Sequence, residues 1–335
     1  MNIDEALKLL PGVPMVESPF FPQIVETSDW DEETRRIGRD LHEKGYAILD
    51  FPEVDGIADR VRESLEDKFD LAAWRGGAGQ GLRIQDAWQF NEDVRRIAVN
   101  GRIVHLLSTL YGRSAFPFQT LNFPVGTEQH FHSDSIHFSS MPERFMCGVW
   151  LAMEDIGEDQ GPLVYYPGSH RWPIYSNEHV GHHDIDRRQA RQDIFHDLWQ
   201  GLVKAHGVEP RTAPLRKGQA LIWAANLLHG GAPHRDRTKT RWSQVTHYYF
   251  DDCAYYTPML SDPIVNAIFF RQPFNIQTGE PVRNKRGLPT LVQSLFPGFD
   301  PAAYLAANGD IAAAGADPFQ HYMEHGWKEG RPLRL

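Results

Sequence analysis

After residue 115 the sequence predicts many short strands separated by turn residues, and this pattern constrains the fold more than any other feature. Each strand is bounded by Gly, Pro or Asp residues that favour turns. Many short strands with such boundaries favour a sandwich or barrel over alternating strands and helices. We therefore predict a mainly β fold. The predicted strands are Phe116–Phe123, Phe145–Met153, Leu163–Tyr166, Gln219–Trp223 and Trp242–Phe250.

Helices are expected before these strands. Residues 1–30 hold several prolines and predict an irregular leader. The stretch Asp31–Glu43 predicts a helix with acidic residues in its first turn, ended by a glycine. Tyr46–Leu49 then predicts a buried strand, and Val54–Phe69 a second helix. Gly76–Gly81 predicts a loop, since it lacks the strand context of a phosphate-binding loop.

The 335 residues allow one large domain and a small appendage. We expect a main domain over residues 1–290, with its core at about 35–250, and a small helical module over 291–335. The module is alanine-rich and predicts two or three short helices that pack on the main domain or on a partner. A polar, histidine-rich insertion, Ile174–Gly207, has a helical second half. Insertions of this length in a β fold are usually functional loops or lids.

Composition excludes several classes of protein. The net charge of −10 disfavours a general binder of nucleic-acid backbones. The two cysteines, Cys147 and Cys253, form no disulfide framework and suit a reducing compartment. The start of the chain lacks the pattern of a signal peptide. The longest apolar run, Ala220–Leu228, is too short to span a bilayer. We expect a cytoplasmic protein without a nucleic-acid partner.

The densest polar cluster is His130–His137. Residues two apart in an extended strand face the same side, so His132 and Asp134 can share one metal ion. Iron(II) in oxygenases favours two histidines and one carboxylate, with positions left open for the reactants. The second histidine must come from elsewhere, and His229, at the end of a predicted strand, is the best candidate. Solvated loop histidines are the alternative.

A cation follows in the same region. Arg241 opens the last predicted strand. A dicarboxylate co-substrate needs a buried cation at its far end, and the planar guanidinium binds a carboxylate through two hydrogen bonds. Arg235 and Arg237, in the same basic run, are better explained as surface residues. A surface position is the alternative for Arg241 as well.

Rival interpretations stay open at this point. A cupin-type metalloenzyme would use His130 and His132 with a glutamate close behind, but the next acid after Asp134 is the distant Glu143. His182–Asp184 is a further cluster, yet adjacent residues point to opposite sides of an extended chain. A jelly-roll binding protein without catalysis is the rival from another class.

An ordered set of motifs resembles the phytanoyl-CoA dioxygenase-like family of iron(II)- and 2-oxoglutarate-dependent oxygenases, which includes ectoine hydroxylases. The resemblance covers roughly residues 35–250, and the combination is far more specific than any one motif. It implies a double-stranded β-helix, a jelly roll whose open end holds the iron, with N-terminal and inserted helices. The motifs are Gln119–Leu121, His132–Asp134, Val149–Asp155, Gly161–His170, Lys217–Ile222, Leu228–Gly230 and Arg241.

The resemblance also implies a reaction and its residues. Iron(II), 2-oxoglutarate and O2 would hydroxylate a substrate, with release of succinate and CO2. Arg241 would bind the distal carboxylate of 2-oxoglutarate, while Trp150 and Leu121 would line its pocket, core packing being their alternative. The implied iron ligands are His132, Asp134 and His229.

The chain departs from the family pattern in places. Relatives often carry Ser two residues after the distal histidine, where Gly231 stands here, so a hydrogen bond to the co-substrate must come from elsewhere. The interval between His229 and Arg241 is about one residue longer than usual. Halogenating relatives replace the carboxylate with a small residue, so the retained Asp134 favours hydroxylation.

The substrate is predicted only by class. The polar and aromatic residues near the metal pair favour a polar or anionic substrate, with structural roles as the alternative. The tail resembles a module often attached to bacterial glycosyltransferases of surface-polysaccharide clusters, which implies a glycan-related substrate. A fatty-acyl or acyl-CoA substrate is the alternative. The candidate substrate residues are Arg83, Gln85, Trp88, Gln119, Asn122 and His130.

Overall fold

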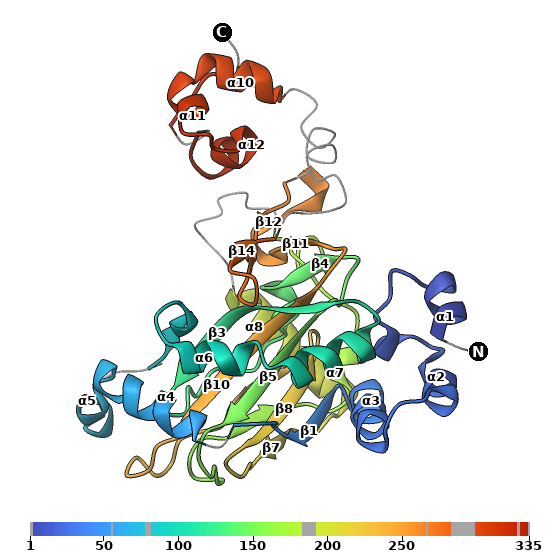
Figure 1. Cartoon of the computed structure of the whole chain (residues 1–335), viewed down its shortest axis with the longest axis vertical. Helices are drawn as coiled ribbons and strands as arrows, with labels where there is room; N and C mark the ends of the chain where they lie inside the picture. The colour runs from blue at the N-terminus through green and yellow to red at the C-terminus, as the bar shows by residue number, and fades with distance from the viewer. Residues whose placement is uncertain are drawn as a thin grey trace.

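The structure is a computed structural model. It describes residues 3–54, 56–77, 82–182, 192–265, 267–282, 299–326 and 329–333. Most of the loop predicted over Gly76–Gly81 lies outside these residues, as do His183 and Asp184. Figure 1 shows a body of sheets with helices along its flank and a small helical module near the C-terminus. Within the described ranges, every helix is too short or too polar to cross a membrane.

A six-stranded antiparallel sheet forms the centre of the molecule. Its two middle strands, Met146–Ala152 and Ser243–Phe250, are buried along their whole length, because helices cover one face and a second sheet covers the other. All the strands predicted for this sheet are present, with ends shifted by a few residues. In spatial order they are β1 (Tyr46–Asp50), β8 (Gln219–Ala224), β5 (Met146–Ala152), β10 (Ser243–Phe250), β3 (Ala115–Phe123) and β2 (Ile84–Gln85).

A smaller antiparallel sheet faces the central one. It consists of β7 (Arg211–Ala213), β6 (Leu163–Tyr165) and β9 (His229–Gly231). Side chains from both sheets meet in one apolar cluster, in which Leu163 and Trp150 take part. The two layers form the predicted jelly roll. The remaining strands are β4 (Ser139–Met141), β11 (Ala254–Tyr256), β12 (Phe270–Arg271), β13 (Phe274–Asn275) and β14 (Glu280–Pro281).

Helices of the first third flank the sheets, and all but one of them contribute to the main apolar core (Figure 1). The exception is Leu71–Arg75, which packs in a separate cluster with Val125. The third of these helices confirms its prediction: the Asp31 carboxylate accepts a hydrogen bond from the Thr34 amide at 2.7 Å, and Gly45 ends the helix at φ 83°. They are α1 (Ile3–Leu9), α2 (Phe21–Thr27), α3 (Glu32–Lys44), α4 (Ile57–Leu65), α5 (Leu71–Arg75), α6 (Glu92–Ala98) and α7 (Gly101–Tyr111).

Predictions for the N-terminal part need correction at two points. Residues 1–30 hold α1 and α2 rather than an irregular leader, since apolar residues such as Phe21 and Ile24 are buried in the core. The helix predicted from Val54 starts only at Ile57, because Gly56 has a left-handed conformation with φ 74°. It ends as a short 3-10 turn at Lys68.

Two further helical segments occur in the second half of the chain. Helix α8 (Gln192–His206) forms the second half of the insertion. The C-terminal module holds α10 (Pro301–Ala307), α11 (Gly309–Ala313) and α12 (Pro318–His321). Its Phe319 packs in the module's own cluster and also against Ala254 of β11. The module therefore contacts the main body, while the predicted boundary between residues 290 and 291 lies outside the described residues.

Candidate active site

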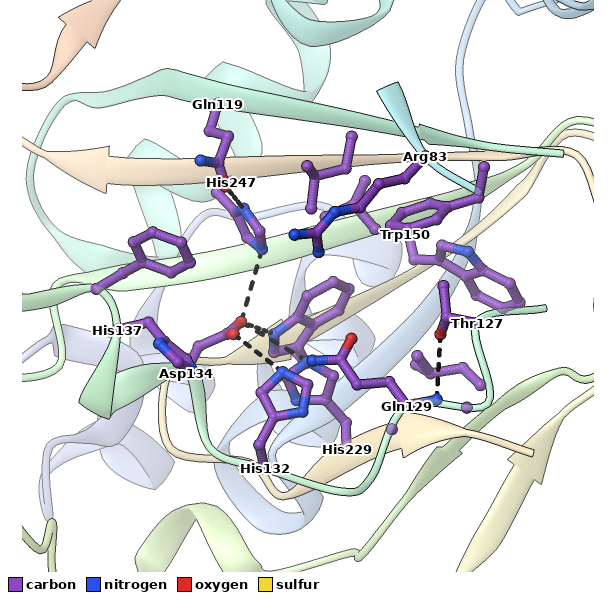
Figure 2. Close-up of a pocket in the computed structure, with 18 of the residues that line it drawn as sticks. Arg83, Gln119, Thr127, Gln129, His132, Asp134, His137, Trp150, His229 and His247 are labelled. Carbon is purple, nitrogen blue, oxygen red and sulfur yellow. Dashed lines mark hydrogen bonds and ion pairs between the residues drawn. The ribbon is translucent and has the colours of Figure 1, made fainter. Parts of the chain in front are cut away.

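A cavity of about 270 Å³ lies between the two facing sheets. Figure 2 shows the side chains that point into it. Its residues come from strands far apart in the sequence, including β3, β5, β9 and β10. The cavity brings together all the predicted iron and 2-oxoglutarate residues: Leu121, His132, Asp134, Trp150, His229 and Arg241.

Three buried side chains converge at one end of the cavity. His132 and His229 are partners across an antiparallel bridge, with backbone N–H···O distances of 2.8 and 3.0 Å. Their Nε2 atoms lie 3.6 and 3.7 Å from the two carboxylate oxygens of Asp134. One ligand atom from each residue lies within 4.8 Å of the others. This arrangement can hold one metal ion.

The local backbone differs from the extended strand that we predicted for the metal pair. His132 is extended, but Asp134 begins a 3-10 turn that runs to Ile136. The Ser133 hydroxyl caps this turn by accepting a hydrogen bond from the Ser135 amide at 3.2 Å. The chain therefore bends directly after the metal pair, while both side chains still face one point.

The histidine rings are oriented by the backbone. Nδ1 of His132 lies 3.1 Å from the carbonyl oxygen of His130, and Nδ1 of His229 lies 3.0 Å from that of Leu227. A carbonyl only accepts, so Nδ1 carries the proton and the Nε2 lone pair faces the cluster. Two imidazole nitrogens and one carboxylate are the donor set that non-haem iron(II) favours. The residues present therefore fit iron(II).

Protonation favours metal binding as well. Burial by itself raises the pKa of the Asp134 carboxyl, but His229, His132 and His247 outweigh it and hold that pKa well below its usual range. Burial lowers the pKa of His229 to about 4. At neutral pH the carboxylate is charged and the imidazole is neutral, which are the forms that bind a divalent metal.

Arg241 lies deeper in the same cavity. Its Nη2 donates to the Val125 carbonyl at 3.1 Å, and its guanidinium lies 5.3 Å from the Trp150 ring centre. Its Nε is buried without a hydrogen-bond partner, and no carboxylate of the described residues lies within ion-pair distance. Burial lowers its pKa to about 10, so the side chain stays charged. A buried, unpaired guanidinium fits the carboxylate of a small ligand.

Gly231 packs too closely for the serine that the family resemblance led us to expect at this position. A Cβ at this position would lie 2.9 Å from the Glu128 amide nitrogen and 3.0 Å from the Thr127 hydroxyl. Residues 127–129 occupy the space where a larger side chain at position 231 would lie, and Thr127 and Gln129 line the cavity. Their side chains therefore supply polar groups on the side where the sequence predicted a missing hydrogen bond.

Only part of the predicted substrate set lines the cavity. Arg83, Gln85 and Gln119 do so. Their placement follows from the edge of the central sheet, where Gln85 pairs with Leu121 of β3. Strand alternation then directs Gln119 and Leu121 to the same side.

The other candidates lie outside the cavity lining. Trp88 stacks on Phe274 at 5.9 Å between ring centres. Asn122 points to the opposite face of β3 and donates to the Gln244 amide oxygen at 3.2 Å. His130 turns away from the cavity and stacks on His196 of α8. The metal pair of His130 and His132 that a cupin-type enzyme would use therefore does not form. Strand parity explains Asn122; the packing of surrounding helices and hairpins places the other two.

Sequence reasoning missed His247. Its Nε2 lies 3.7 Å from the Asp134 carboxylate, and its Nδ1 lies 3.0 Å from the amide oxygen of Gln119 (Figure 2). The signal was present, since Val245 and His247 are two residues apart in β10, which begins two residues after Arg241, and all three residues line the cavity.

A comparison with known protein families gives a match that covers most of the chain. The family model described as Phytanoyl-CoA dioxygenase (PhyH) matches residues 28–241. The peroxisomal phytanoyl-CoA dioxygenase of Rattus norvegicus is 28% identical over 190 residues, which is 52% of this chain and 50% of that protein. A probable phytanoyl-CoA dioxygenase of Caenorhabditis elegans is 27% identical over 140 residues, 39% of each chain. The matches thus span half or less of these relatives.

Solved structures share the fold. The non-heme alpha ketoglutarate dependent carbocyclase SnoK from nogalamycin biosynthesis superposes with a TM-score of 0.53 at 18% identity, covering 77% of this chain and 95% of that one. EctD from S. alaskensis, with 2-oxoglutarate and 5-hydroxyectoine, gives a TM-score of 0.50 at 15% identity and covers 70% and 83%. The family match ends at residue 241, so it does not extend to the C-terminal module.

Proposed function

The chain belongs to the phytanoyl-CoA dioxygenase family, and on that premise we propose that it hydroxylates a small-molecule or glycan-related substrate with release of succinate and CO2. As a member of this family it is an iron(II)- and 2-oxoglutarate-dependent oxygenase. One observation carries the proposal. The ligand atoms of His132, Asp134 and His229 converge in a buried cavity that also holds the unpaired guanidinium of Arg241.

Each of these residues has a proposed role. The two histidines and Asp134 hold the iron, and Arg241 binds the distal carboxylate of 2-oxoglutarate. Trp150 and Leu121 form apolar walls beside that cation. When bound, iron(II) and 2-oxoglutarate supply the activation of oxygen that attacks a C–H bond.

The protein contributes orientation and dryness. Trp223 donates a hydrogen bond from its indole to Asp134 Oδ2 at 2.8 Å, which fixes the carboxylate. Backbone carbonyls fix both histidine rings. Phe123, Leu163 and Val245 line part of the cavity and limit the access of water on that side. Because Asp134 occupies a ligand position, hydroxylation is favoured over halogenation.

The cavity limits the size of the substrate. Its volume of about 270 Å³ is shared with 2-oxoglutarate. Ligand pockets commonly measure roughly 300–1,000 Å³, so a single sugar unit or a short acyl end is what fits. The choice of a sugar rests only on the sequence resemblance of the tail to modules attached to glycosyltransferases, a part of the chain that the family match does not cover. Acyl thioesters are the alternative, with only the acyl end inside.

Substrate-stimulated release of succinate tests this proposal. Purified protein with iron(II), 2-oxoglutarate and oxygen is screened against nucleotide sugars, glycolipids, amino acids and acyl thioesters. We expect stimulation by a sugar-containing compound, and none in His132→Ala. Stimulation by amino acids or acyl thioesters alone would reject the glycan-related substrate.

A further inference from the structure

The cavity holds a second guanidinium, that of Arg83. This residue directly precedes the edge strand β2, which pairs with β3 through Ile84 and Gln85. Figure 2 shows its side chain pointing into the cavity, toward the end where Asp134 lies. The residue as a whole is exposed, so solvent reaches it while its head group lines the cavity.

Arg83 has no partner among the residues that the structure describes. Arginines elsewhere in the chain pair with carboxylates, as Arg60 does with Asp93 at 2.7 Å and Arg144 with Glu17 at 2.8 Å. Among the residues that the structure describes, none forms a hydrogen bond or an ion pair with the Arg83 guanidinium. Its five donors are therefore available to a ligand.

A charge count shows what kind of ligand that is. The charges of iron(II) and Arg241 together cancel those of Asp134 and the 2-oxoglutarate dianion. The two histidines that hold the metal add no charge, because imidazole binds a metal in its neutral form. Arg83 is then one positive charge in excess. In a partly buried cavity such a charge attracts an anion strongly.

The rest of the lining leaves this charge uncompensated. Asp134 is the only acidic residue among the described residues of the cavity lining, and the metal uses it. Several other polar side chains of the lining are neutral amides, those of Gln85, Gln119, Gln129 and Gln192. Amides can bind hydroxyl groups but do not balance a cation.

We propose that the substrate carries an anionic oxygen group, a carboxylate or a phosphate ester, and that Arg83 binds it. Arg241, deep in the cavity, serves the co-substrate, and Arg83, at the exposed side, serves the substrate. The inference rests on the proposed oxygenase function but not on the glycan assignment. It makes Arg83 the residue that selects charged over neutral substrates.

Binding of matched compounds tests the inference. Protein loaded with iron(II) and 2-oxoglutarate without oxygen is titrated calorimetrically with glucuronate, glucose 6-phosphate and glucose, and with hexanoate and hexanol. We expect an anionic member to bind at least ~10-fold more tightly than its neutral partner, and added salt to weaken it. Arg83→Gln should remove this preference, and Arg83→Lys should keep part of it, because a lysine retains the charge without the planar fork.

The controls separate the alternatives. Arg75→Gln removes an exposed arginine of α5 outside the cavity and should change nothing. Arg83→Gln should leave the visible band of the iron and 2-oxoglutarate complex unchanged. If Arg83→Gln weakens the binding of 2-oxoglutarate instead, Arg83 serves the co-substrate and the inference is wrong. Equal binding of neutral partners, or no binding of any anion, also overturns it. A wild-type protein that forms no band rejects the proposed function itself.

Discussion

The carboxylate at the metal site is held by an indole. Trp223 donates to Asp134 Oδ2, and the adjacent Gly148 makes room for it, since a Cβ there would clash with the ring. The pair lies where β8 and β5 run side by side, with Gly148 opposite Trp223. The position of the Asp134 oxygen therefore depends on a residue that binds no metal.

Trp223→Phe keeps an aromatic ring and removes only the indole donor. We expect the affinity for iron(II) to fall by roughly 10- to 100-fold, as for other partners that orient metal ligands. Anaerobic titration with iron(II) measures this. Trp172→Phe, at a half-buried residue outside the cavity, is the matched control. Equal affinities for the Trp223 variant and the wild type would contradict the orienting role.

Gly231 is a second sensitive residue. A Cβ there would press on the segment that carries Thr127 and Gln129. We expect Gly231→Ala to raise the 2-oxoglutarate concentration needed for the visible band by about tenfold, while iron affinity stays the same. Gly201→Ala is the control, because a Cβ at that helical glycine meets no atom within 4 Å. If both variants bind 2-oxoglutarate equally well, the close packing does not matter.

His170 links the stability of the fold to pH. It is 2% exposed, packs against Gly45, and burial lowers its pKa to about 4 from the ordinary 6.5. Below pH 6.5 the unfolded chain takes up this proton more readily than the native one. The free energy of unfolding should therefore fall as pH falls from 6.5 toward 4.

Urea unfolding of the wild type and His170→Gln between pH 7 and pH 5 checks this prediction. The variant should lose less stability over this interval, by up to about 1.4 kcal/mol for each pH unit. His105→Gln is the control, at a histidine on α7. Parallel pH profiles for all three proteins would show that His170 does not carry the proton linkage.

At the scale of elements, α8, the helix of the insertion, borders the cavity. Phe195 and Trp199 are buried in a cluster that includes Ile136, two residues beyond Asp134. Gln192 at the start of the helix lines the cavity. The position of the helix is compatible with the predicted lid. Phe195 and Trp199 are the two aromatic side chains that pack the helix onto the main domain.

Trp199→Ala should loosen this helix. Removing a buried Trp costs about 3–5 kcal/mol of packing, which is enough to speed hydrogen exchange of α8 amides strongly. Exchange in β5 should change less, since that strand lies inside the central sheet. Lys204→Ala, at an exposed site of the same helix, is the control. Uniform acceleration across the chain would indicate global destabilisation and not a detachable lid.

Strands and their parity were predictable from the sequence, because alternation and turn residues are local properties. The central strands and α3 were confirmed within a few residues. Local patterns did not predict α1 and α2, whose apolar residues are buried only once the core exists. They also missed the short 3-10 turn at Asp134, which a single serine cap sets.

At the scale of the whole molecule, the jelly roll brings residues from many separate segments of the chain into one cavity. The metal and co-substrate positions could be predicted, since motifs in a fixed order carried them. Substrate positions could not. The places of Trp88 and His130 depend on Phe274 and on α8, partners remote in sequence. Such contacts between distant segments have no local signature.

We propose that His132, Asp134 and His229 hold iron(II) and that Arg241 anchors 2-oxoglutarate, and one titration tests this most directly. Purified apo-protein is titrated without oxygen with iron(II) and 2-oxoglutarate, and the visible charge-transfer band is recorded. We expect a band in the wild type, its loss in His132→Ala, a weaker affinity for 2-oxoglutarate in Arg241→Ala, and no change in Arg235→Ala. A wild-type protein without the band, or a band that survives His132→Ala, would contradict it.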